Sequence, residues 1–138
     1  TNDLAKELVL PKQTGRAGLL YALGSIILTA KAYNVITLDG VFNGISDEEG
    51  LRSEAEEGKN MGYDGKTLIH PNQIGLTNAI FSPTEKEIDL ANKIIEAYEK
   101  AKEEKSGVTT VDGVLVEELH VKQSLALISK MKMIQSMS

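Results

Sequence analysis

The sequence predicts an α/β protein in which helices alternate with short parallel strands. From Arg16 to Asn34, apolar residues recur every three or four positions, which predicts a helix packed on a sheet. A β-rich run at 35–38 follows, and a second helix predicted at 47–61 precedes another short strand at 66–69. Helix, strand, helix and strand joined by short connections are typical of a parallel βα array. The stripe of the first helix consists of Leu19, Leu20, Leu23, Ile26, Ile27 and Ala30.

Local signals mark the ends of these elements. Thr14 and Gly15 supply a cap before the first helix, and Asn34 supplies a stop after it. The first turn of the second helix is acidic, which complements the helix dipole, and Gly62 ends that helix.

The second half of the sequence predicts two helices and then a hairpin. A short helix at 71–80 begins with proline, and Thr84 with Glu87 opens a longer helix as a capping box. We expect that helix to reach about Glu104 and to be broken by Gly107.

A β-hairpin and a last helix complete the predicted elements. Runs at 108–111 and 114–116 flank Asp112-Gly113, a dipeptide that favours the primed turns of hairpins. An amphipathic helix is predicted from about Glu118 to Met133.

Composition excludes several classes of protein. The 138 residues suit one domain or part of a larger one, and 41% hydrophobic with 25% charged residues is ordinary for a soluble globular protein. A net charge of −5 with interleaved signs predicts no nucleic-acid or membrane partner, and the lack of cysteine excludes disulfides, thiolate catalysis and cysteine zinc sites. Without a long apolar run or a signal peptide, we expect a cytoplasmic or organelle-matrix protein, and the start at Thr1 suggests a cut into a longer polypeptide.

The segment from Gly62 to Ile74 carries the strongest motif. It predicts a turn, a buried strand, a polar break and a helix start, with His70, Asn72 and Gln73 where the strand ends. In α/β folds, ligands bind at the carboxyl ends of strands, so these residues are candidates for a binding site.

This motif, Asp-Gly-Lys-Thr-Leu-Ile-His-Pro-Asn-Gln-Ile at 64–74 followed by Phe-Ser-Pro at 81–83, resembles the last barrel strand of CoA-ester lyases of the citrate lyase beta subunit/malyl-CoA lyase family. The resemblance implies a TIM (β/α)₈ barrel, of which this chain would hold about the last two βα units, because such a barrel needs about 250 residues. It divides the chain into a barrel part, 1–82, and a C-terminal helical extension with a hairpin-helix lid, 83–138.

The family cleaves or forms a carbon–carbon bond of a 3-hydroxyacyl-CoA, of the malyl-CoA, citramalyl-CoA or citryl-CoA class. The resemblance therefore implies Mg²⁺ as cofactor, an acyl-CoA and a small keto acid as ligands, and a homo-oligomer, a trimer or hexamer, whose lid closes on a neighbouring subunit.

Asp3 is implied to be a Mg²⁺ ligand, because the family has an aspartate after its sixth strand and Mg²⁺ prefers hard oxygen ligands. From the residues alone, Asp3 is more often the cap of a turn. The family's second metal carboxylate and its substrate arginine would lie upstream of Thr1, so we expect the chain alone to be inactive.

Two further residues are implied to be catalytic. Asp39 ends the strand at 35–38 and would face the barrel mouth; an Asx-turn is the equal alternative. Glu117 lies in the implied lid, where the family has an acid/base that acts in trans; an exposed first-turn glutamate is its alternative.

Ile69, His70 and Pro71 are implied to line the cleft that CoA enters. We expect His70 to contribute shape and hydrogen bonding rather than to act as a general base, because the only other histidine is His120. Lys66 and Gln73 are expected to be positioning groups, with a solvated lysine as the alternative at Lys66.

Two other functions remain open from the sequence. A metal-dependent pyruvate-type aldolase on the same barrel would need no CoA and would generally lack the hairpin and helix after residue 107. The chain could also be a non-catalytic remnant for CoA binding or oligomerisation.

Overall fold

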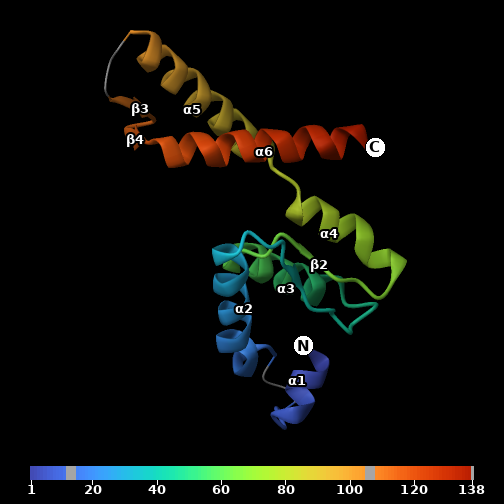
Figure 1. Cartoon of the computed structure of the whole chain (residues 1–138). Coiled ribbons are helices and arrows are strands. Elements are labelled where there is room, and N and C mark those ends of the chain that lie inside the picture. The colour runs from blue at the N-terminus through green and yellow to red at the C-terminus, as the bar shows by residue number, and fades with distance from the viewer. Residues whose placement is uncertain (12–14, 105–107, 138) are drawn as a thin grey trace. The chain divides into compact units, whose positions relative to one another are not determined.

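The computed structural model describes residues 1–11, 15–104 and 108–137. The chain forms two compact units, residues 1–81 and residues 82–138 (Figure 1). Each unit combines helices with a two-stranded sheet, so the α/β class predicted from the alternating pattern is confirmed.

The first unit is built around a parallel pair of very short strands. Leu38 of β1 lies opposite Gly65 of β2, and Asp39 lies opposite Lys66. Helix α3 connects the two strands, which makes them a βαβ unit. The elements of this unit are α1 (Asn2–Glu7), η1 (Ala17–Leu19), α2 (Leu20–Ala32), β1 (Leu38–Asp39), α3 (Glu48–Met61), β2 (Gly65–Lys66), η2 (Pro71–Gln73) and α4 (Ile74–Phe81).

Both strands are shorter than their sequence patterns predicted. The predictions at 35–38 and 66–69 were wrong in extent, because the strands comprise only 38–39 and 65–66. Val35 and Ile36 are apolar and β-branched, yet they are 53% and 77% exposed. A strand extends only where a neighbour pairs with it, and among the described residues β1 and β2 pair only with each other.

The first predicted helix is present as η1 followed by α2. Leu19, Leu23 and Ile27 lie in the core. Leu20 and Ile26 are 42% and 51% exposed, so the predicted apolar stripe included residues that are not buried. Asn34 ends the helix as predicted. Its φ is +54°, and the N–H of Val35 donates to Ala30 O at 2.8 Å, which is the Schellman arrangement. The buried core of this unit is Leu19, Leu23, Ile27, Ala55, Tyr63 and Phe81.

The second unit consists of two helices and a hairpin. Thr84 and Glu87 form the predicted capping box at the start of α5. Asp112 and Gly113 both have positive φ, +51° and +80°, as a type I′ hairpin turn requires. The predicted break at Gly107 lies outside the described residues. The elements are α5 (Glu85–Glu103), β3 (Thr109–Val111), β4 (Val114–Val116) and α6 (Glu118–Ser136).

No helix in the described part of the chain is both long enough and apolar enough to cross a membrane.

Candidate functional site

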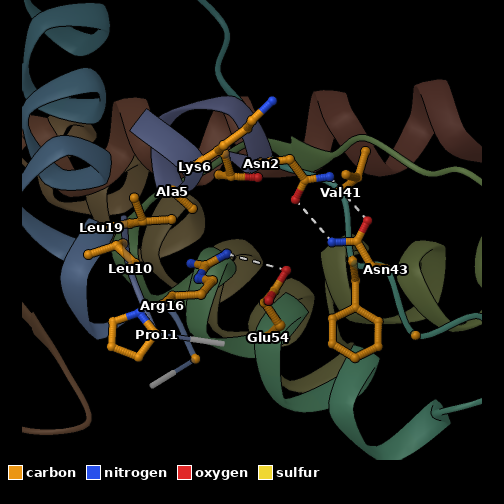
Figure 2. Close-up of a pocket in the computed structure, with 14 residues that line it drawn as sticks. Asn2, Ala5, Lys6, Leu10, Pro11, Arg16, Leu19, Val41, Asn43 and Glu54 are labelled. Atoms are coloured by element: carbon orange, nitrogen blue, oxygen red, sulfur yellow. Dashed lines mark hydrogen bonds and ion pairs between the residues drawn. The ribbon is translucent and has the colours of Figure 1, made fainter. Parts of the chain in front are cut away.

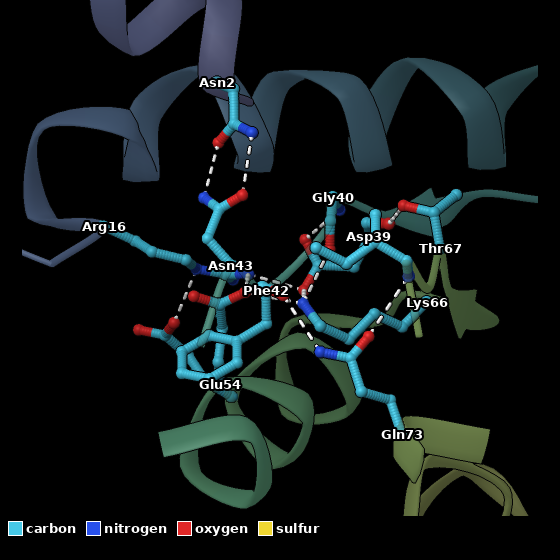
Figure 3. A network of polar contacts seen from close by, with 12 residues as sticks. Asn2, Arg16, Asp39, Gly40, Phe42, Asn43, Glu54, Lys66, Thr67 and Gln73 are labelled. Atoms are coloured by element: carbon cyan, nitrogen blue, oxygen red, sulfur yellow. Dashed lines mark hydrogen bonds and ion pairs between the residues drawn. The ribbon is translucent and has the colours of Figure 1, made fainter. Parts of the chain in front are cut away.

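Charged side chains meet at the carboxyl ends of β1 and β2 (Figure 3). Asp39, the last residue of β1, is fully buried. Its Oδ2 accepts hydrogen bonds from Arg16 Nη1 and, at 3.3 Å, from Lys66 Nζ, while its Oδ1 accepts from the N–H of Gly40 at 2.8 Å. Both carboxylate oxygens are therefore occupied by donors from the protein itself.

Lys66 is the second buried charge of this network. Besides Asp39, its Nζ donates to Glu54 Oε1 at 2.6 Å and to Gly40 O at 2.7 Å. An ammonium group has three donors, and all three have partners here. The solvated alternative for Lys66 was wrong, because the side chain is fully buried. Lys66 instead joins β2 to α3 and to the residue after β1.

Arg16 links the start of the α2 region to β1 and α3. Its Nε lies 2.9 Å from Glu57 Oε2, and its Nη1 lies 3.7 Å from Glu54 Oε1. Burial lowers the pKa of Arg16, but the hydrogen bond and charge of Asp39, with the charges of Glu54 and Glu57, raise it above its ordinary value overall. Arg16 is therefore held as a cation between three carboxylates.

Sequence reasoning did not single out Arg16, although a signal was present. Arg16 precedes the first turn of a helix, where the dipole disfavours a cation unless a carboxylate lies nearby. Glu54 and Glu57 are three residues apart and so share one face of α3, which supplies those carboxylates.

Gly58 explains how α3 approaches this network so closely. A Cβ at Gly58 would lie 2.6 Å from Asp39 Oδ2. A glycine in a helix interior costs about 1 kcal/mol relative to alanine. Glycine is nevertheless needed at this position, because the side chain of any larger residue would displace the buried Asp39 carboxylate.

Gln73 connects the loops that follow the two strands. It is almost fully buried; its Oε1 accepts from the N–H of Ile69 at 3.1 Å, and its Nε2 donates to Phe42 O at 3.0 Å. The predicted positioning role of Gln73 fits these contacts, since one side chain fixes both loops.

The three residues predicted to contact CoA lie in the segment after β2, and this segment, residues 69–71, is called the rim. Ile69 is 49% exposed, and Pro71 begins η2. His70 Nδ1 accepts from the N–H of Asn72 at 3.2 Å, which leaves Nε2 to carry the proton of the neutral ring. His70 thus caps a turn, and the contact of these residues with CoA stays a prediction.

A cavity of about 550 Å³ opens beside the network, between α1, the η1 region before α2, the loop after β1 and α3 (Figure 2). Lys6, Asn43 and Glu54 supply polar groups, while Leu10 and Phe42 supply apolar surface. Its volume suits a small organic ligand. Arg16 also lines it, so the cavity and the charge network share a wall.

Asp3 lies in the first turn of α1 and is exposed. A carboxylate in that place suits the helix dipole, and the N-cap is Thr1 rather than Asp3. Mg²⁺ is commonly bound by one or two carboxylates with waters and substrate oxygens, so Asp3 fits as one ligand. Within residues 1–11, 15–104 and 108–137, no three His, Cys, Asp or Glu side chains gather into a metal site. The metal role of Asp3 therefore stays a prediction.

Glu117 lies in the second unit, at the N-cap of α6. Its side chain is exposed, and its backbone N–H donates to His120 Nδ1 at 3.0 Å. The His120 side chain thus accepts a hydrogen bond from the backbone at the start of α6. The predicted acid/base role of Glu117 needs an accessible carboxylate, which this position provides.

Comparison with known proteins identifies the family. The model of the HpcH/HpaI aldolase/citrate lyase family matches residues 1–71. The chain belongs to this family. With the curated relatives of this family, named for malyl-CoA and citrate lyase, this match confirms the resemblance predicted from residues 64–74.

Curated relatives in this family are named for CoA esters or for citrate lyase. The chain is 50% identical to a (3S)-malyl-CoA thioesterase of Cereibacter sphaeroides, over 91% of this chain and 45% of that protein. It is 42% identical to citrate lyase subunit beta of Leuconostoc mesenteroides subsp. cremoris, over 72% of this chain and 33% of that protein. It is 33% identical to an L-malyl-CoA/beta-methylmalyl-CoA lyase of C. sphaeroides, over 84% of this chain and 36% of that protein. The chain thus spans less than half the length of these relatives.

Solved structures of citrate lyase-type proteins have a fold similar to that of this chain. CitE of Mycobacterium tuberculosis, crystallised with magnesium, acetoacetate and coenzyme A, matches with a TM-score of 0.67 and 24% identity, over 85% of this chain and 42% of CitE. A citrate lyase of Burkholderia xenovorans LB400 matches with a TM-score of 0.70 and 22% identity, over 93% of this chain and 38% of that one. At these identities, the likeness concerns the fold.

Proposed function

We propose that the whole protein containing this chain is a Mg²⁺-dependent CoA-ester lyase acting on a 3-hydroxyacyl-CoA. The reach of the similarity carries this proposal. The family model covers aldolases and citrate lyases alike and ends at residue 71, whereas the relatives named for malyl-CoA match 91% and 84% of the chain. A match over 91% of the chain must reach α6, and one over 84% must reach the hairpin, a region that a pyruvate-type aldolase would generally lack.

The first unit is, in this proposal, the end of a (β/α)₈ barrel. Strands β1 and β2 are parallel neighbours connected through α3, as successive barrel strands are. The buried network lies at their carboxyl ends, which is the end of a barrel that carries active sites. The rest of the barrel would pair with the free edges of these strands, and the second unit would be the lid on a neighbouring subunit of a homo-oligomer.

The residues of this chain would divide the work as follows. A bound Mg²⁺ ion would stabilise negative charge that develops on substrate oxygens. Asp3 would contribute one ligand, and the network of Asp39, Arg16 and Lys66 would hold the strand ends and their loops in place. Glu117 would take or give the proton, and the rim at residues 69–71 would contact the CoA thioester.

Thioester hydrolysis is a second candidate, and a specific observation favours it. Identity to the (3S)-malyl-CoA thioesterase is 50%, against 33% to the L-malyl-CoA/beta-methylmalyl-CoA lyase. Both reactions begin from malyl-CoA. The lyase reaction breaks a carbon–carbon bond to give acetyl-CoA and glyoxylate, whereas hydrolysis adds water to give malate and free CoA.

Product analysis of the whole protein separates the two reactions. With (3S)-malyl-CoA and Mg²⁺, we expect glyoxylate and acetyl-CoA in equal amounts and little free thiol. Free thiol with malate, and no glyoxylate, would assign the hydrolase instead. If no product forms from (3S)-malyl-CoA, citramalyl-CoA or citryl-CoA, the result favours the non-catalytic alternative. The purified 138-residue chain should show no activity above background, because it supplies one candidate metal carboxylate.

A further inference from the structure

Helix α1 rests directly on the residue that follows β1. A Cβ at Gly40 would lie 2.9 Å from Thr1 Cβ, and closer still to the Oγ1 and Cγ2 atoms of Thr1. Because real Cβ atoms do not approach other atoms so closely, Thr1 leaves no room for a methyl group at Gly40. The N-cap of α1 and the end of β1 are therefore in close contact.

A pair of amide groups makes a second contact between the same two segments (Figure 3). Asn2 Nδ2 donates to Asn43 Oδ1 at 3.1 Å, and Asn43 Nδ2 donates to Asn2 Oδ1 at 3.0 Å. The two hydrogen bonds run in opposite directions and close a ring. Such a pair restrains both the distance and the rotation of α1 relative to the loop after β1.

The surface beneath α1 is itself fixed by the buried network. The N–H of Gly40 donates to Asp39 Oδ1 at 2.8 Å, and Gly40 O accepts from Lys66 Nζ at 2.7 Å. Asp39 and Lys66 are both buried. Gly40 is thus held through its N–H and its carbonyl, so a helix docked on it has a defined position.

Helix α1 depends on such contacts, because it cannot be stable alone. It has six residues, none of them buried. An isolated helix shorter than about 12 residues is marginal in water. Ala5 packs against the core, but the Thr1 and Asn2 contacts are the ones that flank Asp3.

We propose that Asn2 and Asn43, together with the contact of Thr1 on Gly40, form a clamp that positions the Asp3 carboxylate at the end of β1. Asn43 is then a positioning residue for the site, although it lies 40 positions from Asp3 in the sequence. The functional consequence rests on the proposed metal role of Asp3. The clamp itself is tested without it.

Hydrogen exchange of the whole protein that contains this chain tests the clamp. The N–H groups of Ala5 and Leu8 bond to Thr1 O and Leu4 O, and they report whether α1 stays docked. Asn43→Ala should speed their exchange about threefold or more, because two net hydrogen bonds are lost. Exchange in α4 should not change. Asn78→Ala, the same truncation at an exposed position of α4, is the control. Unchanged exchange in α1 of Asn43→Ala would overturn the clamp.

A compensating pair tests the second contact independently. Gly40→Ala should also speed exchange in α1, because its methyl group displaces Thr1. Thr1→Gly in the same chain removes the three atoms that lie nearest to the methyl group, so the double variant should regain most of the protection. If the double variant exchanges as fast as Gly40→Ala, the loss came from elsewhere and the contact does not hold α1.

The last test asks whether the clamp positions Asp3 as a metal ligand. Electron paramagnetic resonance of the whole protein, without substrate, measures its affinity for Mn²⁺. Asn43→Ala should weaken Mn²⁺ binding several-fold, whereas Asn78→Ala should not. Faster exchange in α1 with unchanged Mn²⁺ affinity would reduce the clamp to a structural contact and overturn its positioning role. If Asp3→Ala also leaves Mn²⁺ affinity unchanged, the proposed metal role of Asp3 has failed, and the exchange result alone decides whether the clamp exists.

Discussion

Asp39 and Glu117, the two carboxylates expected to be catalytic, lie in opposite surroundings. Asp39 is fully buried, and three donors occupy its two oxygens. Glu117 is exposed at the start of α6, and the helix backbone there is held by His120. A carboxylate bound by two buried cations can fix the backbone around it but cannot reach a ligand without breaking those ion pairs. An exposed carboxylate is free to contact another molecule.

Asp64 lies between these extremes. Its oxygens accept from Lys31 Nζ at 2.8 and 3.0 Å and from the N–H of Thr37 at 2.8 Å, and its side chain is 36% exposed. Burial raises the pKa of Asp64, but Lys31 and Thr37 lower it more, so the pKa lies below its usual value. The three carboxylates thus form a series in burial, from Asp39 through Asp64 to Glu117.

The largest effect is expected at the buried end of this series. Asp39→Ala leaves Arg16 and Lys66 without their shared carboxylate, and breaking a buried ion pair in this way costs about 3–5 kcal/mol of unfolding free energy. Urea unfolding of the whole protein measures it. Glu56→Ala, an exposed residue of α3, is the matched control and should cost less than about 0.5 kcal/mol.

A second variant separates charge from packing. Asp39→Leu with Lys66→Met replaces the pair by apolar groups and should recover much of the stability that Asp39→Ala loses. If Asp39→Ala costs no more than the control, the ion pairs do not hold the strand ends together.

Substitution of Glu117 should lower activity without changing stability, the reverse of what is expected at Asp39. In the whole protein, Glu117→Gln should lower kcat by about 10²–10⁴-fold, the range for proton transfer by a positioned side chain, while the urea midpoint stays unchanged. Glu118→Gln, at the adjacent exposed position, is the control and should keep its activity. Steady-state kinetics on the two variants decides between an acid/base and a surface glutamate.

A mixing experiment tests whether Glu117 acts in trans. Subunits carrying Glu117→Gln and subunits carrying Asp3→Ala each lack one part of a shared site. Mixed oligomers should regain part of the activity, because some sites then contain both intact residues. Mixed oligomers as inactive as their parents would refute the in-trans role.

A smaller effect on stability is expected at Thr84. Thr84 is the N-cap of α5, so it serves as a reference for Glu117, the N-cap of α6. Thr84 Oγ1 accepts from the N–H of Glu87 at 3.2 Å, and the N–H of Thr84 donates to Glu87 Oε2 at 2.7 Å. Thr84→Ala should cost about 1 kcal/mol of stability, measured by urea unfolding. A similar cost for Glu117→Ala, with kcat unchanged in Glu117→Gln, would mean that Glu117 is an ordinary cap, and the comparison with Asp39 would lose its functional meaning.

The helices and the hairpin could be predicted from the sequence because their signals are local. The capping box at Thr84 and the turn at Asp112-Gly113 need only neighbouring residues, and both are present. Strand length depends on partners far along the chain, which is why the predictions at 35–38 and 66–69 were too long.

For Asp39, the position at a strand end could be predicted from the sequence, but its contacts could not. The place of Asp39 at a strand end followed from the pattern, yet nothing local showed that Arg16 and Lys66 would enclose it. Their distances in sequence are 23 and 27 residues, so only the fold brings them together. An arginine at a helix start and a glycine within α3 were the available signals for such enclosure.

The smallest effect is expected at Asp64, through the dependence of stability on pH. A carboxyl whose pKa is lower when folded than when unfolded binds fewer protons in the folded state, so it stabilises the protein above its unfolded pKa. This contribution is present above about pH 4, near the ordinary value of 3.8, and is lost as the pH falls through the lower folded value. Because the Lys31–Asp64 pair is partly exposed, salt and water reduce its strength.

Asp64→Asn removes that proton equilibrium while keeping an oxygen that can accept from Thr37. Unfolding free energies of the variant should therefore fall less between pH 5 and pH 3 than those of the parent chain, and the two curves should converge at the acid end. Asp89→Asn, on the exposed face of α5, is the control and should follow the parent curve throughout. If Asp64→Asn also follows the parent curve, Lys31 and Thr37 do not stabilise the ionised carboxylate, and the series from Asp39 to Glu117 would lack its middle member.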